Sequence, residues 1–392
     1  MLYRVAVPTG QSFTVFALYR DSPQRRAALA RPSGAPERYL LFGLDQLAER
    51  GIRVGHNLDQ GAAAPAWARL AGAGLEAMVH KMGGYGGDFA RVLPSLRQAS
   101  RADVVYSTVD TVGIPLLALT ALGLVRRPIV YVSIGLLPRL AGLETRRIVR
   151  AYARILRGAA AVVAYGAGEA EELRAWLGGG RVVFVPFGVD TEHFRPSNGR
   201  PEFDVLSVGA DPRRDFELLL LAARRNPGVS FRIVASADHK HALGPLPRNV
   251  ELEADIPFEA MRARLEQARL VALPVHENAY SGATTVLLQA MACAKPVVVS
   301  RTAAIAEGYH LRDIENCRLV APGDALAFER ALLELLANPE GAAAMGTRAR
   351  QTAERHLSWD RYVDSIATLV LKAAESRRRF GVTAERDLPR VD

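Results

Sequence analysis

Short apolar runs alternate with longer amphipathic segments along most of this chain. The short runs are rich in valine, isoleucine and leucine and end in turn residues, which is typical of parallel strands that helices cover on both faces. The longer segments carry apolar residues three and four positions apart, as surface helices do. Strands are predicted at residues 2–7, 13–19, 52–54, 103–107, 129–133, 160–164, 182–186, 204–208, 231–235, 250–252, 270–273 and 297–299. Helices are predicted at residues 37–50, 144–157, 169–177, 216–224, 258–267, 284–293, 327–336, 341–355 and 359–375.

This alternation of strand and helix predicts an α/β fold with parallel sheets. Residues 11–37, apart from the strand expected there, are predicted to form a long loop. A chain of 392 residues is long enough for two domains. The turn-forming residues 197–201 separate them, so we expect a first domain at 1–196 and a second at 197–375. The polar residues 376–392 are predicted to form a loose tail.

The composition is that of a globular protein, with 49% apolar and 23% charged residues. No apolar run reaches the length of a membrane span, and the first residues are interpreted as a strand and not as a secretory signal. Cys293 and Cys317 lie in apolar surroundings, so we expect two buried free thiols in a reducing cytoplasm. The net charge of +9 favours anionic ligands or an anionic membrane surface, although the arginine-rich composition alone explains it and is the preferred interpretation.

Three local patterns leave alternatives open. The arginine-rich helix at 144–157 is either a basic membrane-binding helix or, as we favour, a core helix with a solvated basic face. The glycine-dense segment at 81–88 cradles a phosphate or forms a surface turn, and the turn is favoured because the Gly-Lys-Ser/Thr ending is missing. Glu192 and His193 are interpreted as solvated loop residues, because no second His or Cys stands at ligand spacing.

The stretch with the most chemistry is PVHENAYSGATTVLLQAMACAKPVVVS, residues 274–300. A polar loop at 274–281 leads into an apolar helix, and a buried strand follows. Free N–H groups at the start of such a helix, together with its dipole, favour an anion. Gly282 permits close backbone approach, and Ala283 adds little bulk. An ordinary buried strand–helix–strand unit is the alternative interpretation.

Most of residues 1–375 resemble the family 4 retaining glycosyltransferases, which have the GT-B fold, and two stretches give the clearest matches. Within 274–300 the matching residues are Leu288, Ala290, Met291, Ala292, Pro296 and Val297. The second match is the end of the first domain, where Pro186, Gly188, Val189, Asp190, Phe194 and Pro196 fit the family's pattern. From the residues alone, Gly188 permits a positive φ there and Asp190 caps the next turn. The resemblance implies two Rossmann-like, doubly wound domains facing a cleft.

The resemblance also implies which residues hold a nucleotide-sugar donor. They are Gly10, Arg213, Arg214, Ile256, Ser281, Gly282, Ala283, Thr284, Thr285 and Gln289. Arg213 and Arg214 would bind the diphosphate, because a guanidinium fork suits phosphate oxygens. The loop at Ile256 would meet the nucleobase, and Gln289 would reach the ribose hydroxyls.

Three residues are the catalytic candidates that the resemblance implies. Arg214 would neutralise the departing diphosphate. Ser281 and Gln289 stand where the family has acidic residues, and Glu277 is the candidate to supply the missing carboxylate. Ile134 stands where the family commonly has a histidine, and Asp110 is the nearest substitute. No Asp-x-Asp occurs, so we expect no metal at the site.

The expected function is transfer of a sugar from a nucleotide sugar, such as a UDP-sugar or GDP-sugar, to a hydroxyl or amine with retention at the anomeric carbon. The nucleotide sugar is a co-substrate, and no other cofactor is expected. The acceptor is a small molecule, glycan or lipid. Nucleic acid is not an expected partner, and peripheral membrane contact is not favoured. The alternatives are an inactive GT-B protein that binds nucleotide sugars, which Ile134, Ser281 and Gln289 support, and a nucleotide-sugar epimerase.

Overall fold

A computed structural model describes residues 13–61, 63–143, 146–179, 181–197, 199–280 and 282–386, the side chains of 60, 146 and 377–386 apart. The chain divides into two units. The first holds the chain up to Tyr165, residues Ala170–Val185 and the chain from Val363 onward. The second holds Gly166–Glu169 and Pro186–Tyr362. The predicted strand at 2–7 lies outside the described residues.

The first unit is built on a six-stranded parallel sheet in the order β2-β1-β3-β4-β5-β6. Its strands are β1 (Phe13–Leu18), β2 (Ile52–His56), β3 (Val104–Ser107), β4 (Ile129–Ser133), β5 (Ala161–Ala164) and β6 (Val182–Phe184). Every residue of β3, β4 and β5 is buried, which explains why these strands appear in the sequence as unbroken apolar runs.

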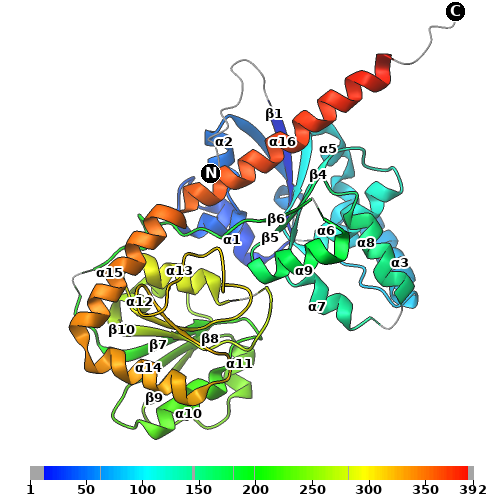
Figure 1. Cartoon of the computed structure of the whole chain (residues 1–392). Coiled ribbons are helices and arrows are strands. Elements are labelled where there is room, and N and C mark those ends of the chain that lie inside the picture. The colour runs from blue at the N-terminus through cyan, green and yellow to red at the C-terminus, as the bar shows by residue number, and fades with distance from the viewer. Residues whose placement is uncertain are drawn as a thin grey trace, which may run out of the picture. The chain divides into compact units, whose positions relative to one another are not determined.

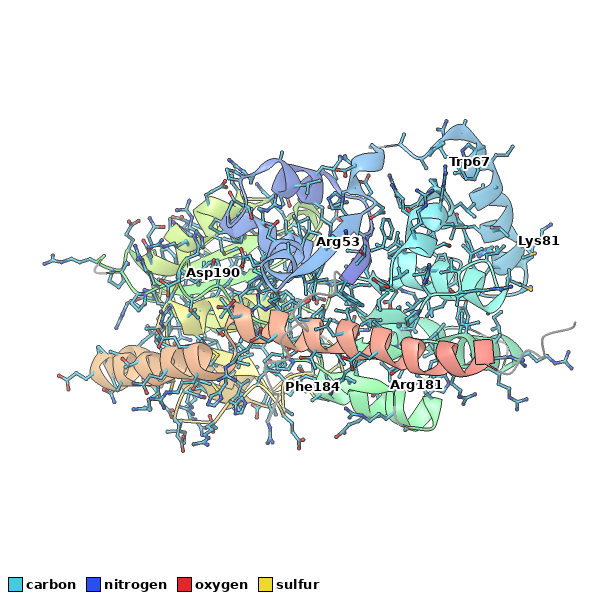
Figure 2. The ribbon with its side chains drawn as sticks, turned by 90° about the horizontal axis from the view of Figure 1, so that it is seen from above. Arg53, Trp67, Lys81, Arg181, Phe184 and Asp190 are labelled. Atoms are coloured by element: carbon cyan, nitrogen blue, oxygen red, sulfur yellow. The ribbon has the colours of Figure 1, made fainter. Side chains whose placement is uncertain are left out.

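Helices cover both faces of this sheet (Figure 1). They are α1 (Pro23–Ala30), α2 (Leu44–Glu49), α3 (Ala66–Lys81), α4 (Phe89–Val92), α5 (Leu96–Arg101), α6 (Asp110–Ala121), α7 (Leu136–Ala141), α8 (Arg146–Leu156) and α9 (Ala167–Leu177), with 3-10 turns at Pro36–Leu41, Leu58–Gln60 and Leu93–Ser95. Trp67 and Lys81 lie near the two ends of α3 (Figure 2), and Trp67 is exposed.

Two predictions for residues 11–50 were wrong. Helix α1 occupies part of the predicted loop, because the Ser22 side chain caps it and Pro23 opens its first turn. The predicted helix at 37–50 is broken into a 3-10 turn and α2, since Phe42 and Gly43 both take positive φ angles. Periodicity alone does not reveal such a break, because the apolar residues on each side keep helical spacing.

The arginine-rich helix α8 is a core helix on one face. Tyr152 and Leu156 are buried in the core of the first unit, while Arg147, Arg150 and Arg154 are exposed. The glycine-dense segment packs against the same helix, because the Tyr85 N–H donates to the Tyr152 hydroxyl at 2.6 Å. A Cβ on Gly87 would lie 2.5 Å from the Thr111 carbonyl oxygen. The glycines of this segment therefore allow it to pack closely against neighbouring elements.

The second unit has its own six-stranded parallel sheet, in the order β12-β11-β10-β7-β8-β9. Its strands are β7 (Phe203–Gly209), β8 (Phe231–Ala235), β9 (Val250–Ala254), β10 (Ala268–Leu273), β11 (Val297–Ser300) and β12 (Arg318–Val320). Its helices are α10 (Phe216–Arg225), α11 (Ala237–Ala242), α12 (Phe258–Gln267), α13 (Thr284–Ala292), α14 (Ala325–Ala337) and α15 (Pro339–His356), followed by the start of α16 (Trp359–Arg386). Helices α10 and α14 lie on one face of this sheet, and α12 and α13 on the other (Figure 1). The prediction of two parallel α/β domains is confirmed.

Several details of the second half differ from the sequence prediction. Strand β12 was missed because it is three residues long and begins with an arginine. Helix α16 continues to Arg386, so residues 376–386 are helical and not a loose tail. Arginine, alanine and glutamate, which are good helix formers, make up part of this segment. His193 is not a solvated loop residue, because its ring stacks on Phe258 with centroids 5.7 Å apart.

The turn after β6 also differs in one respect from its prediction. Asp190 caps it as expected, accepting hydrogen bonds from the Glu192 and His193 N–H groups at 2.9 Å. The φ of Gly188 is not positive. A Cβ at Gly188 would instead lie 2.8 Å from the Ser358 carbonyl oxygen, so this glycine allows two backbones to approach.

Cys293 and Cys317 are both free and buried, as predicted. Within the described ranges, no helix combines the length and the apolar character that a membrane crossing needs.

Candidate functional site

Two loops of the second unit meet at one edge of its sheet. Strands β7 and β10 are parallel neighbours, so the loops that follow them, 210–215 and 274–283, leave from the same edge. The Asp215 N–H donates to the Pro274 carbonyl at 3.0 Å, and the His276 N–H donates to the Arg213 carbonyl at 2.9 Å. These bonds fix the two loops to each other. Ligands of open α/β sheets bind at such carboxyl ends of strands.

Arg214 is the most unusual residue of this edge. Its side chain is 94% buried, since only 6% remains exposed, yet Nε and Nη1 have no hydrogen-bond partner among the described residues. Burial lowers the pKa of Arg214 to about 10, and the nearby Asp211 carboxylate opposes that shift. A buried guanidinium with unused donors carries a large desolvation cost. A bound anion would remove that cost.

Gly209, the last residue of β7, provides the space in which Arg214 lies. A Cβ at this position would fall 2.0 Å from Arg214 Nε. The guanidinium therefore rests directly on the backbone of the strand end, and any larger residue at 209 would displace it.

Arg213 points to the second loop. Its Nε donates to the Tyr280 hydroxyl at 3.2 Å, and its guanidinium lies 5.8 Å from the centre of the Tyr280 ring. This hydrogen bond raises the pKa of Arg213. Arg213 is half-buried and held by an aromatic residue of the other loop, whereas the buried Arg214 has unused donors.

The N-terminus of α13 completes this edge. Ala283 caps the helix with a φ of 58°, and no side chain accepts a hydrogen bond from the first turn. No hydrogen bond joins the Ala283, Thr284 or Thr285 N–H group to another described residue. The Thr284 side chain is hydrogen-bonded to the buried Tyr309 hydroxyl, which also accepts from the Phe187 N–H at 3.1 Å. The first turn is thus held in place with its N–H groups available for an anion.

Gly282 has a packing constraint that the sequence did not show. A Cβ there would lie 2.2 Å from Ile305 Cγ2, so the residue must be glycine to pack against the loop that follows β11. Gln289 is buried in α13, one turn after Thr285, so the two residues share a helix face. Ile256 is half-buried in the loop after β9.

Glu277 lies in the same loop as Tyr280 but is exposed. One of its carboxylate oxygens accepts a hydrogen bond from the Ala303 N–H at 2.9 Å. Glu277 therefore ties the loop after β10 to the loop after β11, and its second oxygen stays available to a ligand hydroxyl.

Asp110 lies in the first unit, at the start of α6, and is 99% buried. Its carboxylate accepts hydrogen bonds from the Tyr131 hydroxyl and, at 3.3 Å, from the Ile134 N–H. Arg139 Nη1 is 4.0 Å away, and the Arg139 guanidinium also lies over the Tyr85 ring, 4.7 Å from its centre. Burial raises the pKa of Asp110 to about 6, against the lowering effect of these partners. The acid thus has a raised pKa beside a partly exposed arginine.

The structure brings together Arg213, Arg214, Glu277 and the start of α13 in the second unit, while Asp110 belongs to the other unit. Gly10 and Ser281 lie outside the described residues. In the part of the chain that is described, no group of three or more His, Cys, Asp or Glu side chains could hold a metal ion.

Sequence reasoning missed three residues that build this edge. Gly209 seats Arg214, Tyr280 holds Arg213, and Tyr309 fixes Thr284. Gly209 and Tyr280 had a signal, since each stands next to a predicted ligand loop. Tyr309 had none, because it lies far from Thr284 in the sequence.

Two family models match consecutive parts of the chain. "Glycosyl transferase 4-like domain" matches residues 4–188, and "Glycosyl transferases group 1" matches residues 205–338. MMP alpha-(1->4)-mannosyltransferase of Mycolicibacterium hassiacum is 26% identical over 207 residues, which are 48% of either chain. D-inositol 3-phosphate glycosyltransferase of Kineococcus radiotolerans is 28% identical over 238 residues, 50% of this chain and 53% of that protein. The chain thus spans about half the length of these curated relatives.

Solved structures match nearly the whole chain. Sucrose-phosphate synthase from Thermosynechococcus elongatus has a TM-score of 0.67 at 17% identity, over 95% of this chain and 100% of that one. Anabaena HepE in complex with UDP and glucose has a TM-score of 0.66 at 17% identity, over 92% and 100% of the two chains. This likeness is one of fold, and it confirms the predicted GT-B class.

Proposed function

Since the chain belongs to the glycosyltransferases with a 4-like first domain and a group 1 second domain, we propose that it transfers a sugar from a nucleotide sugar to an acceptor hydroxyl or amine. The resemblance predicted this family. The single observation that carries the proposal is Arg214, a buried guanidinium with unused donors at the same sheet edge as the open first turn of α13. Both features favour a diphosphate, and a nucleotide sugar brings one.

The second unit is proposed to bind the donor and the first unit the acceptor. Arg214, Arg213 and the N–H groups of Gly282, Ala283, Thr284 and Thr285 would surround the diphosphate, with Gly10 and Ser281 also at the donor. Ile256 would meet the nucleobase, and Gln289 would bind the ribose. An amide can both donate to and accept from ribose hydroxyls. HepE, a neighbour in fold, is described in complex with UDP and glucose, which supports a nucleotide sugar as the co-substrate.

The proposed reaction retains the anomeric configuration and needs no metal. The bond between the anomeric carbon and a diphosphate oxygen breaks, and the acceptor oxygen or nitrogen bonds to that carbon from the same face. The acceptor proton passes to the departing phosphate oxygen, so no strong protein base is required. Arg214 and the α13 amides neutralise the charge that develops on the diphosphate. Glu277 would orient the sugar and Asp110 the acceptor.

The acceptor is proposed to be a small molecule, glycan or lipid. A relative named as a D-inositol 3-phosphate glycosyltransferase supports a polyhydroxylated acceptor. A reducing, cytoplasmic compartment is proposed because Cys293 and Cys317 are both free thiols.

A thermal-shift screen of the full chain against UDP, GDP and their sugars tests donor binding, since a ligand of the native state raises the melting temperature. The stabilising nucleotide sugar is then incubated with candidate acceptors, and products are separated by chromatography. Transfer or donor hydrolysis supports the enzyme, whereas binding without turnover indicates the inactive alternative. A donor whose sugar changes without any acceptor indicates an epimerase. If no nucleotide diphosphate or nucleotide sugar stabilises the chain, the proposal is wrong.

A further inference from the structure

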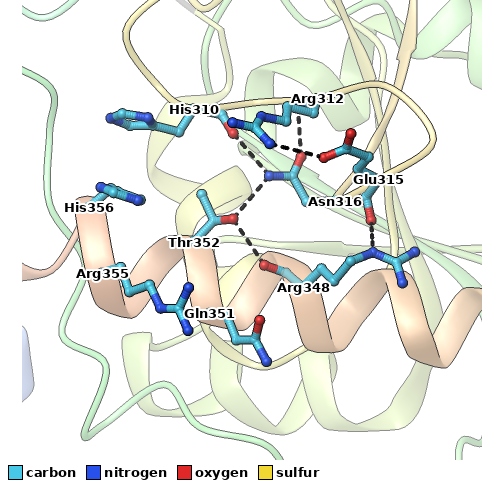
Figure 3. A pocket seen from close by; sticks show the side chains of 9 residues that line it. All are labelled: His310, Arg312, Glu315, Asn316, Arg348, Gln351, Thr352, Arg355 and His356. Carbon is cyan, nitrogen blue, oxygen red and sulfur yellow. Dashed lines mark hydrogen bonds and ion pairs between the residues drawn. The ribbon is translucent and has the colours of Figure 1, made fainter.

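A second candidate site lies between α15 and the loop that joins β11 to β12. It is a pocket of about 240 Å³ (Figure 3). The loop supplies His310, Arg312 and Glu315 to its wall, and α15 supplies Arg348, Arg355 and His356. None of these residues belongs to the donor site described above.

Asn316 holds the loop against the helix. Its side chain is buried and donates to the His310 carbonyl at 2.9 Å and to the Thr352 hydroxyl at 3.0 Å, while its own oxygen accepts from the Arg312 N–H at 2.8 Å. The Thr352 hydroxyl in turn donates to the Arg348 carbonyl at 2.9 Å. Of these bonds, the one between Asn316 and Thr352 crosses from the loop to the helix (Figure 3). The basic side chains are therefore carried on a fixed scaffold.

Positive charge exceeds negative charge in this pocket. Three arginines face one glutamate, Glu315. The Glu315 carboxylate pairs with Arg312 at 3.3 Å, and its carbonyl accepts from Arg348 Nε at 2.5 Å. No hydrogen bond or ion pair joins the Arg355 side chain to another described residue. Arg348 and Arg355 stand seven residues apart on α15, so they lie on the same face of the helix.

Two histidines close one end of the pocket. The rings of His310 and His356 stack with their centres 4.1 Å apart. The pKa of His356 is lowered by burial, and then by His310, Arg361, Arg355 and Arg312. Two further charged side chains line the same pocket: the Glu315 carboxylate on the loop and the Arg348 guanidinium on α15. An anion placed among these groups would favour the protonated histidines.

We propose that this pocket binds a phosphate group, either of a free small molecule or of a lipid headgroup. Arginine forks bind phosphate oxygens bidentately, and neutral or protonated histidines add further N–H donors. The volume is large enough for inorganic phosphate or pyrophosphate and too small for a whole nucleotide sugar, since drug-sized ligands fill roughly 300–1,000 Å³. This binding does not depend on the proposed transfer reaction.

Histidine side-chain NMR of the full chain tests the proposal at the pocket itself. The signals of His310 and His356 are assigned with the variants His310→Asn and His356→Asn, and the wild type is titrated with inorganic phosphate and with pyrophosphate. We expect both signals to shift and the pKa of His356 to rise. The variant Arg355→Ala should weaken phosphate binding about tenfold, the loss of one charge-assisted hydrogen bond.

The matched control is Arg330→Ala, which removes an exposed arginine of α14 outside the pocket and should leave phosphate binding unchanged. Vesicles of phosphatidylcholine with phosphatidylglycerol, in a parallel arm, separate the two sources. A shift with free phosphate supports a soluble ligand, and a shift with vesicles alone supports a headgroup. The proposal is overturned if neither moves the two histidine signals, or if the shifts persist in an Arg348→Ala, Arg355→Ala double variant that circular dichroism shows to be folded.

Discussion

Replacing Arg214 by methionine should stabilise the second unit and at the same time abolish donor binding. The pKa of Arg214 falls from 12.5 to about 10 on folding, which corresponds to about 3 kcal/mol of unfavourable free energy for keeping the charge buried. Methionine has a similar length and no charge, so the variant avoids this cost. Replacing buried ion pairs by apolar residues stabilises some other proteins by about 1–4 kcal/mol, a range that includes this figure.

The same change removes two donors from the proposed diphosphate site. Charge-assisted hydrogen bonds contribute about 1.5–3 kcal/mol each, so donor affinity should fall at least about 100-fold. The assay is thermal unfolding of wild type and variant, each with and without the nucleotide sugar found by the screen. At 100 times its Kd a ligand adds about 2.7 kcal/mol to the wild type, and this addition should disappear in the variant.

The pH dependence gives this prediction a defined sign. Because the folded pKa of Arg214 lies below the unfolded one, the folded state releases its proton first, and wild-type stability gains as pH rises through about 10. The advantage of the variant therefore holds below that pH and shrinks above it. Arg213→Met is the matched control, since its pKa is raised by Tyr280 and its removal relieves no burial cost. A variant that is less stable than wild type, or that still binds the donor, would refute the reasoning.

Three further changes test the two units separately. Gly209→Ala forces Arg214 to move, so we expect about 1–3 kcal/mol of destabilisation in denaturant unfolding and loss of the donor-induced thermal shift. Asp110→Asn should remove a pH dependence: the pKa of Asp110 is raised to about 6, so its contribution to stability is complete below about 4 and is lost as pH rises through 6. Wild type should therefore lose up to about 3 kcal/mol relative to this variant between pH 4 and 7, measured by urea unfolding. Glu277→Gln keeps an oxygen for the Ala303 N–H, so stability should stay within about 0.5 kcal/mol while turnover falls about tenfold or more.

Each of these outcomes can fail in its own way. If Gly209→Ala leaves donor affinity unchanged, the Arg214 guanidinium does not need its position against the end of β7 to bind the donor. Equal pH profiles for wild type and Asp110→Asn would mean that the buried acid titrates normally. Unchanged turnover in Glu277→Gln would leave that residue with a structural role only, as the tie to Ala303.

The fold followed from the sequence wherever burial decided it. Strands buried on both faces are mostly apolar, so β4 was predicted to the residue. Strand β8 was also predicted to the residue, although the half-buried Arg232 interrupts its apolar run. Elements set by backbone geometry were harder to find. The positive φ angle of Phe42 breaks a predicted helix. Hydrophobic spacing does not reveal this break, because the apolar residues before and after Phe42 keep helical spacing.

The candidate site was predictable only in part. The family resemblance implied that Arg214 binds a phosphate, but the sequence did not show that its side chain is buried with unused donors. That property depends on Gly209 and on the neighbouring loop after β10, which are joined to it only by tertiary contacts. Likewise, Gly282 was expected to permit close backbone approach, but the sequence did not show that its lack of a side chain also makes room for Ile305. The sequence shows which residue type stands at a position, but it does not show which tertiary contact requires that residue type.

Helix α13 has a consequence for how such a site can change over evolution. All its residues from Val286 to Ala292 are buried, and the chain that leaves it is pressed against α15, where a Cβ on Gly346 would lie 2.0 Å from the Ala294 carbonyl oxygen. Because α13 is packed against neighbouring elements along most of its length, it cannot tilt to accommodate a new substrate. We therefore expect descendants with altered sugar preference to differ mainly in the segments 210–215 and 276–281. The sequence of helix α13 should stay the same.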